Sequence, residues 1–371
     1  MVGWQGVRFT LPPDWNVAAF SMDRDSGYLR VDAPGGSSVA VQVRWTDASR
    51  PEPGSTTLYS LVAPAVRRLF RRSDPMIKTP SLKANLERMF QDTAKQAKRA
   101  KTSFESSIKA ERREGPHGER TAMNFSWTGA GRGQGKIWYC ETCHRVVIAQ
   151  VVGLAKDGGP ISAVASQLFA SIHDHGEGGY DLWALYDLQV EVPDDFRLLE
   201  QKLLSGYLSL TFGRAGEKII LDRWGLANMT LKRFTLEEWF QNNVSVALKR
   251  MRREERESIR GHSVSHYTGA IPILVLGKLL RDTVGSMRRF PTRYEGGVWL
   301  CPDSNKIFAL QTLRSKRSER LWQDVADRLI CHIGETEQVI QSLADETVDG
   351  LEIESEPPPE PAVKTRSGKR R

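Results

Sequence analysis

The chain has 371 residues, with 53 Lys and Arg against 45 Asp and Glu, and 40% of its residues are hydrophobic. No apolar run approaches the roughly 20 residues of a membrane-spanning helix, and the first residues lack the basic and apolar segments of a signal peptide. Four cysteines in a chain this long do not make a disulfide-stabilised fold. These features exclude membrane, collagenous, fully disordered and small secreted proteins, and they predict a cytoplasmic protein of two domains.

The sequence contains an internal repeat. Two early blocks match at an offset of 179 residues, and the later blocks match at an offset of 161. The matched blocks are Gly27-Tyr28-Leu29 and Gly206-Tyr207-Leu208, Arg44-Trp45 and Arg223-Trp224, and Trp138-Tyr139-Cys140 and Trp299-Leu300-Cys301. A period this long indicates duplicated domains rather than a solenoid, whose repeats run about 20–50 residues. We therefore predict two copies of one domain at residues 1–176 and 180–340, joined by a polar, glycine-rich linker at 173–179.

Each copy is predicted to contain strands, a helix, further strands and a closing helix. Alternating apolar residues predict strands at 7–11, 29–31, 39–45, 121–127, 136–140 and 146–152. Apolar residues at helical spacing predict helices at 58–69, 161–172, 236–251 and 322–333, and Thr235 with Glu238 forms a capping box. The predicted fold class is α+β, with two tandem antiparallel sheets covered by helices. The charged composition of residues 344–371 predicts a disordered tail.

The opening strand runs into a Pro-x-x-Trp turn at Phe9-Thr10-Leu11-Pro12-Pro13-Asp14-Trp15, and 190–196 repeats this pattern with Phe196 in place of Trp. Together with the hairpins, the mid-chain helix and the closing helix, this turn resembles the PsbP/Mog-type fold. The resemblance implies a duplicated PsbP-like domain and a non-enzymatic binding protein. No ligand residue of that family carries over to this chain.

The first copy contains a basic helical insert at about 74–105. Residues 65–120 hold 15 basic and 7 acidic residues, so the net charge of this segment, +8, equals that of the whole chain. Leu82, Leu86, Met89, Phe90 and Ala97 share one helical face. Five cations on the remaining surface are candidates for binding a polyanion: Lys83, Lys95, Lys98, Arg99 and Lys101. A nucleic acid or an anionic surface could bind there through phosphate contacts, without reading sequence.

Cys140 and Cys143 form a C-x-x-C motif between two predicted strands. The motif is typical of a zinc hairpin, but zinc needs four ligands, and His117, His144, His173 and His175 are the candidates for the rest. We expect a reduced cysteine pair with no cofactor, with zinc binding and thiol redox chemistry as alternatives. The second copy keeps only Cys301, so we expect no complete site there. His262 and His266 are about 13 Å apart along a strand, too far to share one metal.

No nucleophile elbow, Walker A loop, HExxH motif or catalytic carboxylate pair is present, so a non-catalytic protein is favoured over an enzyme. The repeated tryptophans are expected to pack in the core. The alternative is an aromatic ligand groove in each domain formed by Arg44, Trp45 and Trp138, and by Arg223, Trp224 and Trp299. The sequence therefore predicts a binding or adaptor protein with an unidentified protein partner. Polyanion binding and chemistry at Cys140 and Cys143 are its alternatives.

Overall fold

The computed structural model describes residues 1–12, 14–23, 26–48, 80–109, 112–114, 120–154, 156–176, 178–186, 188–244, 251–271, 292–315 and 317–332. The predicted helix at 58–69, the first residues of the basic insert and the predicted tail at 344–371 lie outside these ranges. Residues Met1–Cys331 form one compact unit. No helix in the described part of the chain is long and apolar enough to span a membrane.

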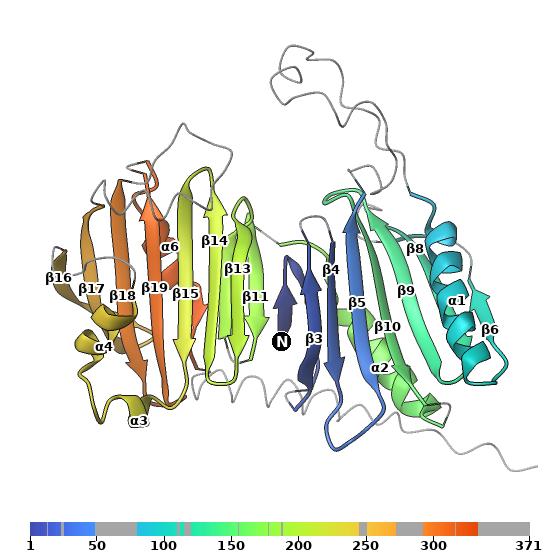
Figure 1. The fold of residues 1–371 in the computed structure, drawn as a ribbon. Helices are drawn as coiled ribbons and strands as arrows, with labels where there is room; N and C mark the ends of the chain where they lie inside the picture. Colours follow the sequence, from blue (N-terminus) through green and yellow to red (C-terminus); the bar gives the residue numbers. More distant parts are fainter. Residues whose placement is uncertain are drawn as a thin grey trace, which may run out of the picture. The chain divides into compact units, whose positions relative to one another are not determined.

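Two large antiparallel sheets have the same strand order (Figure 1). The first contains, in spatial order, β3 (Asn16–Met22), β4 (Ser26–Asp32), β5 (Ala40–Asp47), β10 (Arg145–Gly153), β9 (Arg132–Cys140), β8 (Arg120–Thr128) and β6 (Glu105–Ile108), and β7 (Arg112–Glu114) also pairs with β8. The second contains β13 (Arg197–Leu204), β14 (Tyr207–Arg214), β15 (Glu217–Trp224), β19 (Lys306–Arg314), β18 (Arg293–Cys301), β17 (His262–Ala270) and β16 (Arg252–Ile259). This shared topology agrees with the duplication inferred from the sequence.

Four of the described helices occupy matching positions in the two copies. The described helices are α1 (Leu82–Arg99), α2 (Gly158–Ser171), α3 (Ala227–Thr230), α4 (Leu236–Asn243) and α6 (Leu321–Ala326). Helix α1 packs on β9 as α4 packs on β18, and α2 packs on β10 as α6 packs on β19. Successive residues of a strand face opposite sides of the sheet, so Ile137 contributes to the core beneath α1 and Trp138 to the core beneath α2.

The predicted α+β class is wrong. The described residues are mostly β-strand, in three large antiparallel sheets, and form few helices. The helices predicted at 236–251 and 322–333 end at Asn243 and Ala326, so each covers only part of the second sheet. Strands β3 and β13 were missed because each carries a β-bulge, at Val17/Ala19 and at Leu198/Glu200, which breaks the alternation of apolar and polar residues.

A third sheet joins the two copies. It contains, in order, β2 (Val7–Phe9), β1 (Val2–Trp4), β11 (Tyr180–Leu185), β12 (Leu188–Pro193) and β20 (Leu329–Ile330). The hairpin β1–β2 corresponds to β11–β12, and the two hairpins pair through Gly3 and Ala184, which occupy equivalent positions. The strands therefore meet around an internal pseudo-two-fold axis. Whether residues 1–176 and 180–340 can be separated stays a prediction.

Candidate metal centre

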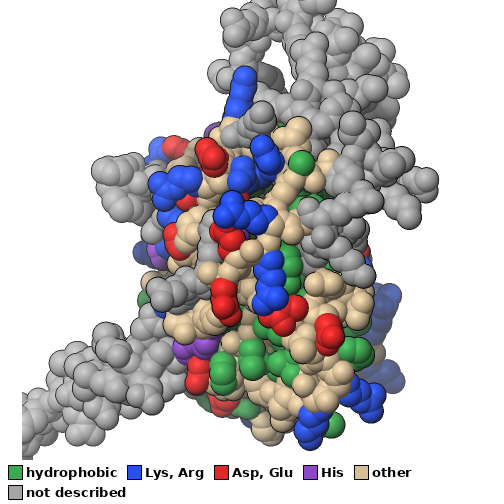
Figure 2. All heavy atoms as spheres, turned by 90° about the vertical axis from the view of Figure 1, so that its left-hand side faces the viewer, with side chains coloured by type: hydrophobic (Ala, Val, Ile, Leu, Met, Phe, Trp, Pro, Cys, Tyr) green, Lys and Arg blue, Asp and Glu red, His purple; other side chains and the backbone are tan. Residues whose placement is uncertain are grey.

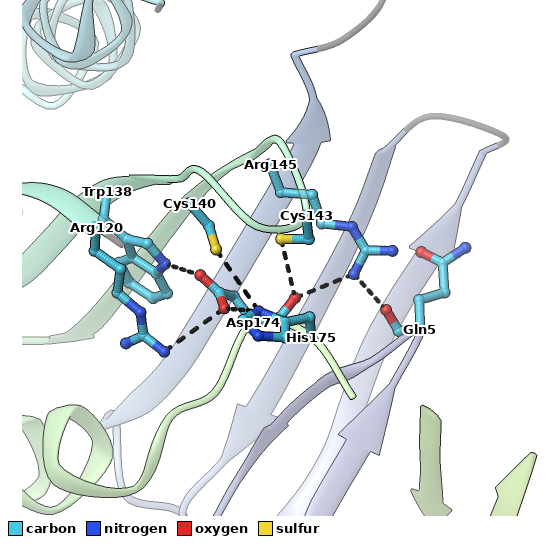
Figure 3. Close-up of polar contacts among 8 residues, drawn as sticks. All are labelled: Gln5, Arg120, Trp138, Cys140, Cys143, Arg145, Asp174 and His175. Carbon is cyan, nitrogen blue, oxygen red and sulfur yellow. Dashed lines mark hydrogen bonds and ion pairs between the residues drawn. The ribbon is translucent and has the colours of Figure 1, made fainter. Parts of the chain in front are cut away.

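The C-x-x-C motif lies at a tight hairpin. Strand β9 ends at Cys140 and β10 begins at Arg145. The backbone N–H of His144 donates to the carbonyl oxygen of Cys140 over 2.9 Å, and His144 has the left-handed φ of 57° that closes the turn. This geometry brings the two cysteine side chains to the same side of the hairpin, where they project toward Asp174 and His175 (Figure 3).

The segment after α2 supplies the facing residues. His173 forms an isolated bridge with Arg8 of β2, with backbone N···O distances of 3.0 and 2.8 Å. The carboxylate of Asp174, which follows, is completely buried. Its Oδ2 accepts a hydrogen bond from the indole Nε1 of Trp138 over 2.5 Å, and its Oδ1 lies 3.6 Å from the guanidinium of Arg120. The bridge and these contacts fix Asp174 and His175 against the hairpin.

Four metal-ligating groups meet at this point. One donor atom each from Cys140, Cys143, Asp174 and His175 lies within 4.8 Å of all the others. The Sγ of Cys140 is 3.6 Å from the Nδ1 of His175. A tetrahedral zinc ion with bonds of about 2.3 Å to sulfur and about 2.05 Å to nitrogen separates those two ligands by about 3.6 Å. This edge of the site therefore already has the length that zinc requires.

A second distance between two of these donor atoms is shorter than zinc requires. The Nδ1 of His175 lies 2.7 Å from the Oδ1 of Asp174, which is a direct hydrogen bond. Nitrogen and oxygen ligands of one tetrahedral zinc ion would be about 3.4 Å apart. Zinc binding would therefore replace this hydrogen bond and its proton, and would lengthen the edge by about 0.7 Å. The buried Asp174 would keep its contacts with Trp138 and Arg120, and such outer contacts orient metal ligands.

The two thiols of the hairpin share a proton. A hydrogen bond from Cys143 lowers the pKa of the Cys140 thiol to about 6, although burial acts in the opposite direction. Backbone N–H groups of Cys143 and Thr142 also lower this pKa. The same hydrogen bond raises the pKa of Cys143, and its burial adds to the increase. The pair therefore holds one thiolate near neutral pH, and thiolates are the form of cysteine that binds metal.

The structure places two further potential ligands beside Cys140 and Cys143, and whether the pair binds metal stays a prediction. Asp174 and His175 complete the cluster. The sequence placed both in a linker, yet the bridge between His173 and Arg8 ties this segment to a sheet. Of the other histidines considered, His144 pairs with the hydroxyl of Tyr139 over 3.0 Å, and His117 lies outside the described residues.

The structure does not make the two Arg-Trp pairs equivalent. In the first sheet, Val147 pairs with both Trp45 and Trp138. In the second, Phe308 pairs with Trp299 and with Arg223 rather than with Trp224. A shift of one residue turns a side chain to the other face of a sheet. Trp45 accordingly packs in the core beneath α2, whereas Trp224 contacts Trp239 of α4 at 4.4 Å between ring centroids.

The remaining groove candidates have different environments. Trp138 and Trp299 are equivalent, and both are buried. Arg44 is exposed and lies 5.0 Å over the ring of Tyr28, whereas Arg223 is buried. The groove residues of the first copy therefore do not reproduce those of the second. That these residues bind a ligand stays a prediction.

The expected helix forms in the segment predicted as a basic insert, but it packs on β9 as α4 packs on β18, so α1 corresponds to α4 rather than to an insertion. Helix α1 begins at Leu82 with Ser81 as its N-cap, and its buried residues are Leu82, Leu86, Phe90 and Ala97. The five candidate cations Lys83, Lys95, Lys98, Arg99 and Lys101 are exposed. Two of them pair with acids of the same helix: Lys83 lies 3.9 Å from Glu87 and Lys95 lies 3.0 Å from Asp92. The helix thus buries its apolar face and exposes its cations.

No family model and no curated protein matches this chain. The resemblance to the PsbP/Mog-type fold stays a prediction, and the function must be inferred from the chain's own geometry.

Proposed function

We propose that this chain is a non-catalytic binding protein whose first copy is stabilised by a structural Zn²⁺ ion bound to Cys140, Cys143, Asp174 and His175. The convergence of four donor atoms within 4.8 Å of one another carries the proposal, because structural zinc is bound by four protein ligands. Four protein donors close a tetrahedral site. A catalytic zinc needs a position left open for water or substrate, so this arrangement supports a structural rather than a catalytic ion.

Zinc is favoured over thiol redox chemistry at the same cysteines. Cys140 is 0% exposed at the end of a strand, whereas a redox-active thiol must be reached by its partner. None of the four cysteines of the chain, all of which lie in described segments, forms a disulfide. The proposal includes an unidentified protein partner and a reducing compartment such as the cytoplasm, where thiols persist.

The first test is the zinc content of the purified full-length chain. Cys143→Ser is expected to remove one zinc ion per chain, because serine does not supply a thiolate. Thr142→Ser changes an exposed side chain of the same turn and is expected to keep the wild-type content. Zinc bound equally by both variants would overturn the proposal. A metal-free wild type that forms a Cys140–Cys143 disulfide under mild oxidation would instead support the redox alternative.

Polyanion binding by α1 is the second candidate, because α1 exposes four of the candidate cations and the fifth, Lys101, is exposed just after its C-cap. The side of the molecule that bears β16, β17 and α4 shows basic and acidic side chains interspersed (Figure 2), and β16 itself contains both Arg and Glu. The described residues of this face therefore form no cationic patch comparable to that of α1. Any polyanion would be expected on α1, where Lys98 and Arg99 occupy the last turn.

Polyanion binding predicts a strong salt dependence. With three to five phosphate contacts, the affinity for a DNA duplex should fall about two orders of magnitude between 50 and 200 mM salt. Replacing Lys98, Arg99 and Lys101 with Gln should reduce the slope of log affinity against log salt by about 3. A matched control replaces the exposed Lys202, Arg252 and Arg320 with Gln and removes the same charge. Equal effects of the two triple variants, or no binding at 50 mM salt, would exclude this candidate.

A further inference from the structure

The backbone of the second copy repeats the framework of the first metal centre. In the first copy, His173 bridges Arg8 of β2. In the second, Ile330 of β20 pairs with Gln189 of β12, and Gln189 is the counterpart of Arg8. His173 and Ile330 are therefore equivalent, so the residues that follow them are also equivalent. This places Cys331 at the position of Asp174.

Donor atoms gather at this second position. One donor atom each from His262, Cys301 and Cys331 lies within 4.8 Å of the other two. Cys301 is 0% exposed and Cys331 is 2% exposed. The Sγ of Cys301 lies 3.8 Å from the carbonyl oxygen of Cys331. In the first copy the carbonyl oxygen of Asp174 is contacted over 3.8 Å by Cys143, whereas Cys140 is the counterpart of Cys301. A thiol of each hairpin therefore lies against the residue at the position of Asp174.

The donor that the second hairpin lacks is replaced from a neighbouring strand. The first hairpin contains Cys143, whereas Ser304 stands at the corresponding position of the second. Strand β8 places Arg120 opposite Cys140. Strand β17 pairs Ser265 with Val298, and this register, continued by three residues, places His262 opposite Cys301. The position opposite the equivalent cysteine therefore holds a cation, Arg120, in the first copy and a potential ligand, His262, in the second.

The tryptophans support the equivalence. Trp138 and Trp299 are buried at equivalent positions of β9 and β18. The indole of Trp138 donates to Asp174. Positions 174 and 331 both hold a residue able to ligate a metal, although its chemical type changes.

We propose that the second copy binds its own Zn²⁺ ion through His262, Cys301 and Cys331, with His332 as the fourth ligand. His332 follows Cys331 directly in the sequence, as His175 follows Asp174. Two thiolates and two imidazoles are a donor set typical of structural zinc. This site has its own ligands and does not depend on whether the first copy binds metal.

The test uses the full-length chain and measures zinc per chain. The wild type is expected to hold two zinc ions, and His262→Gln is expected to hold one. His262 is half-buried, so this change disturbs the fold less than a change at the buried cysteines. Ser263→Gln is the matched control, because it introduces the same side chain one residue along β17, on the opposite face of the sheet, and should retain two ions. His332→Gln is expected to behave like His262→Gln.

The outcomes separate the two metal sites. The wild type could hold one zinc ion per chain that is lost in Cys143→Ser but kept in His262→Gln. That result would overturn the second site and leave the first. One ion with the reverse pattern would support the second site and overturn the first. If His262→Gln fails to fold, the number of zinc ions that the wild type releases to a colorimetric chelator still decides. Release of two ions per chain supports the proposal. Release of one ion per wild-type chain, together with no zinc in Cys143→Ser, overturns it.

Discussion

Zinc is expected to raise the melting temperature of the chelator-stripped chain by about 8 to 16 °C for each site that it fills. A ligand that binds only the folded state at a free concentration 1,000 times its Kd contributes about 4.1 kcal/mol. For a domain of 150–250 residues, each kcal/mol corresponds to about 2–4 °C. The effect is large because the ligands come from segments that only folding brings together, Cys140 and Cys143 from the β9–β10 hairpin and Asp174 and His175 from beyond α2.

Differential scanning calorimetry with and without zinc measures this shift. Cys143→Ser should lose the contribution of the first site, while Thr142→Ser should melt like the wild type in both states. A melting temperature that zinc leaves unchanged in the wild type would contradict a structural role for the ion.

Trp4→Ala is expected to lower the free energy of unfolding by about 3–5 kcal/mol, the usual cost of removing a large buried aromatic side chain. Trp4 is 0% exposed and lies in the sheet that joins the two copies. Its ring centroid is 5.0 Å from that of Trp183 and 5.4 Å from that of Phe20. Trp183 in turn lies 4.8 Å from Phe212. These four rings link the first sheet, the joining sheet and the second sheet.

Denaturant unfolding followed by both fluorescence and circular dichroism measures the effect of Trp4→Ala. The two probes should follow one transition in the wild type and separate in the variant, because the copies lose the contact that couples them. Phe90→Ala removes a ring on the buried face of α1, away from the joint, and should destabilise the chain without separating the probes. A loss below about 1 kcal/mol for Trp4→Ala would show that the joining sheet contributes little to stability.

The internal repeat and most central strands could be predicted from sequence, because buried central strands keep a regular alternation. The blocks Trp138-Tyr139-Cys140 and Trp299-Leu300-Cys301 are equivalent in both sheets, as their offset predicted. The match between Arg44-Trp45 and Arg223-Trp224 was misleading, since pairing places Trp45 at the position of Arg223. An identity of only two residues does not determine which residues of the two sheets are equivalent, because the strand register is set by hydrogen bonding.

The ligands beyond the C-x-x-C motif could not be found from spacing. Asp174 and His175 are separated from the cysteines by β10 and α2, and only the bridge of His173 to β2 brings them back. The closing helix of the second copy, α6, is shorter than α2 of the first copy. A sequence alignment that matches these two helices therefore misses the correspondence of Asp174 with Cys331. Two adjacent potential ligands after each closing helix were the available signal, and comparing the copies by strand pairing reveals it.

X-ray absorption at the zinc edge of the purified full-length chain tests the metal centre most directly. Two thiolates with imidazole and carboxylate ligands predict about two sulfur atoms at about 2.3 Å and about two nitrogen or oxygen atoms at about 2.0–2.2 Å for each zinc ion. Cys140, Cys143, Cys301 and Cys331 would supply all the sulfur. A spectrum with a sulfur shell at that distance would support the account. Zinc surrounded by oxygen and nitrogen alone, without sulfur, would contradict it.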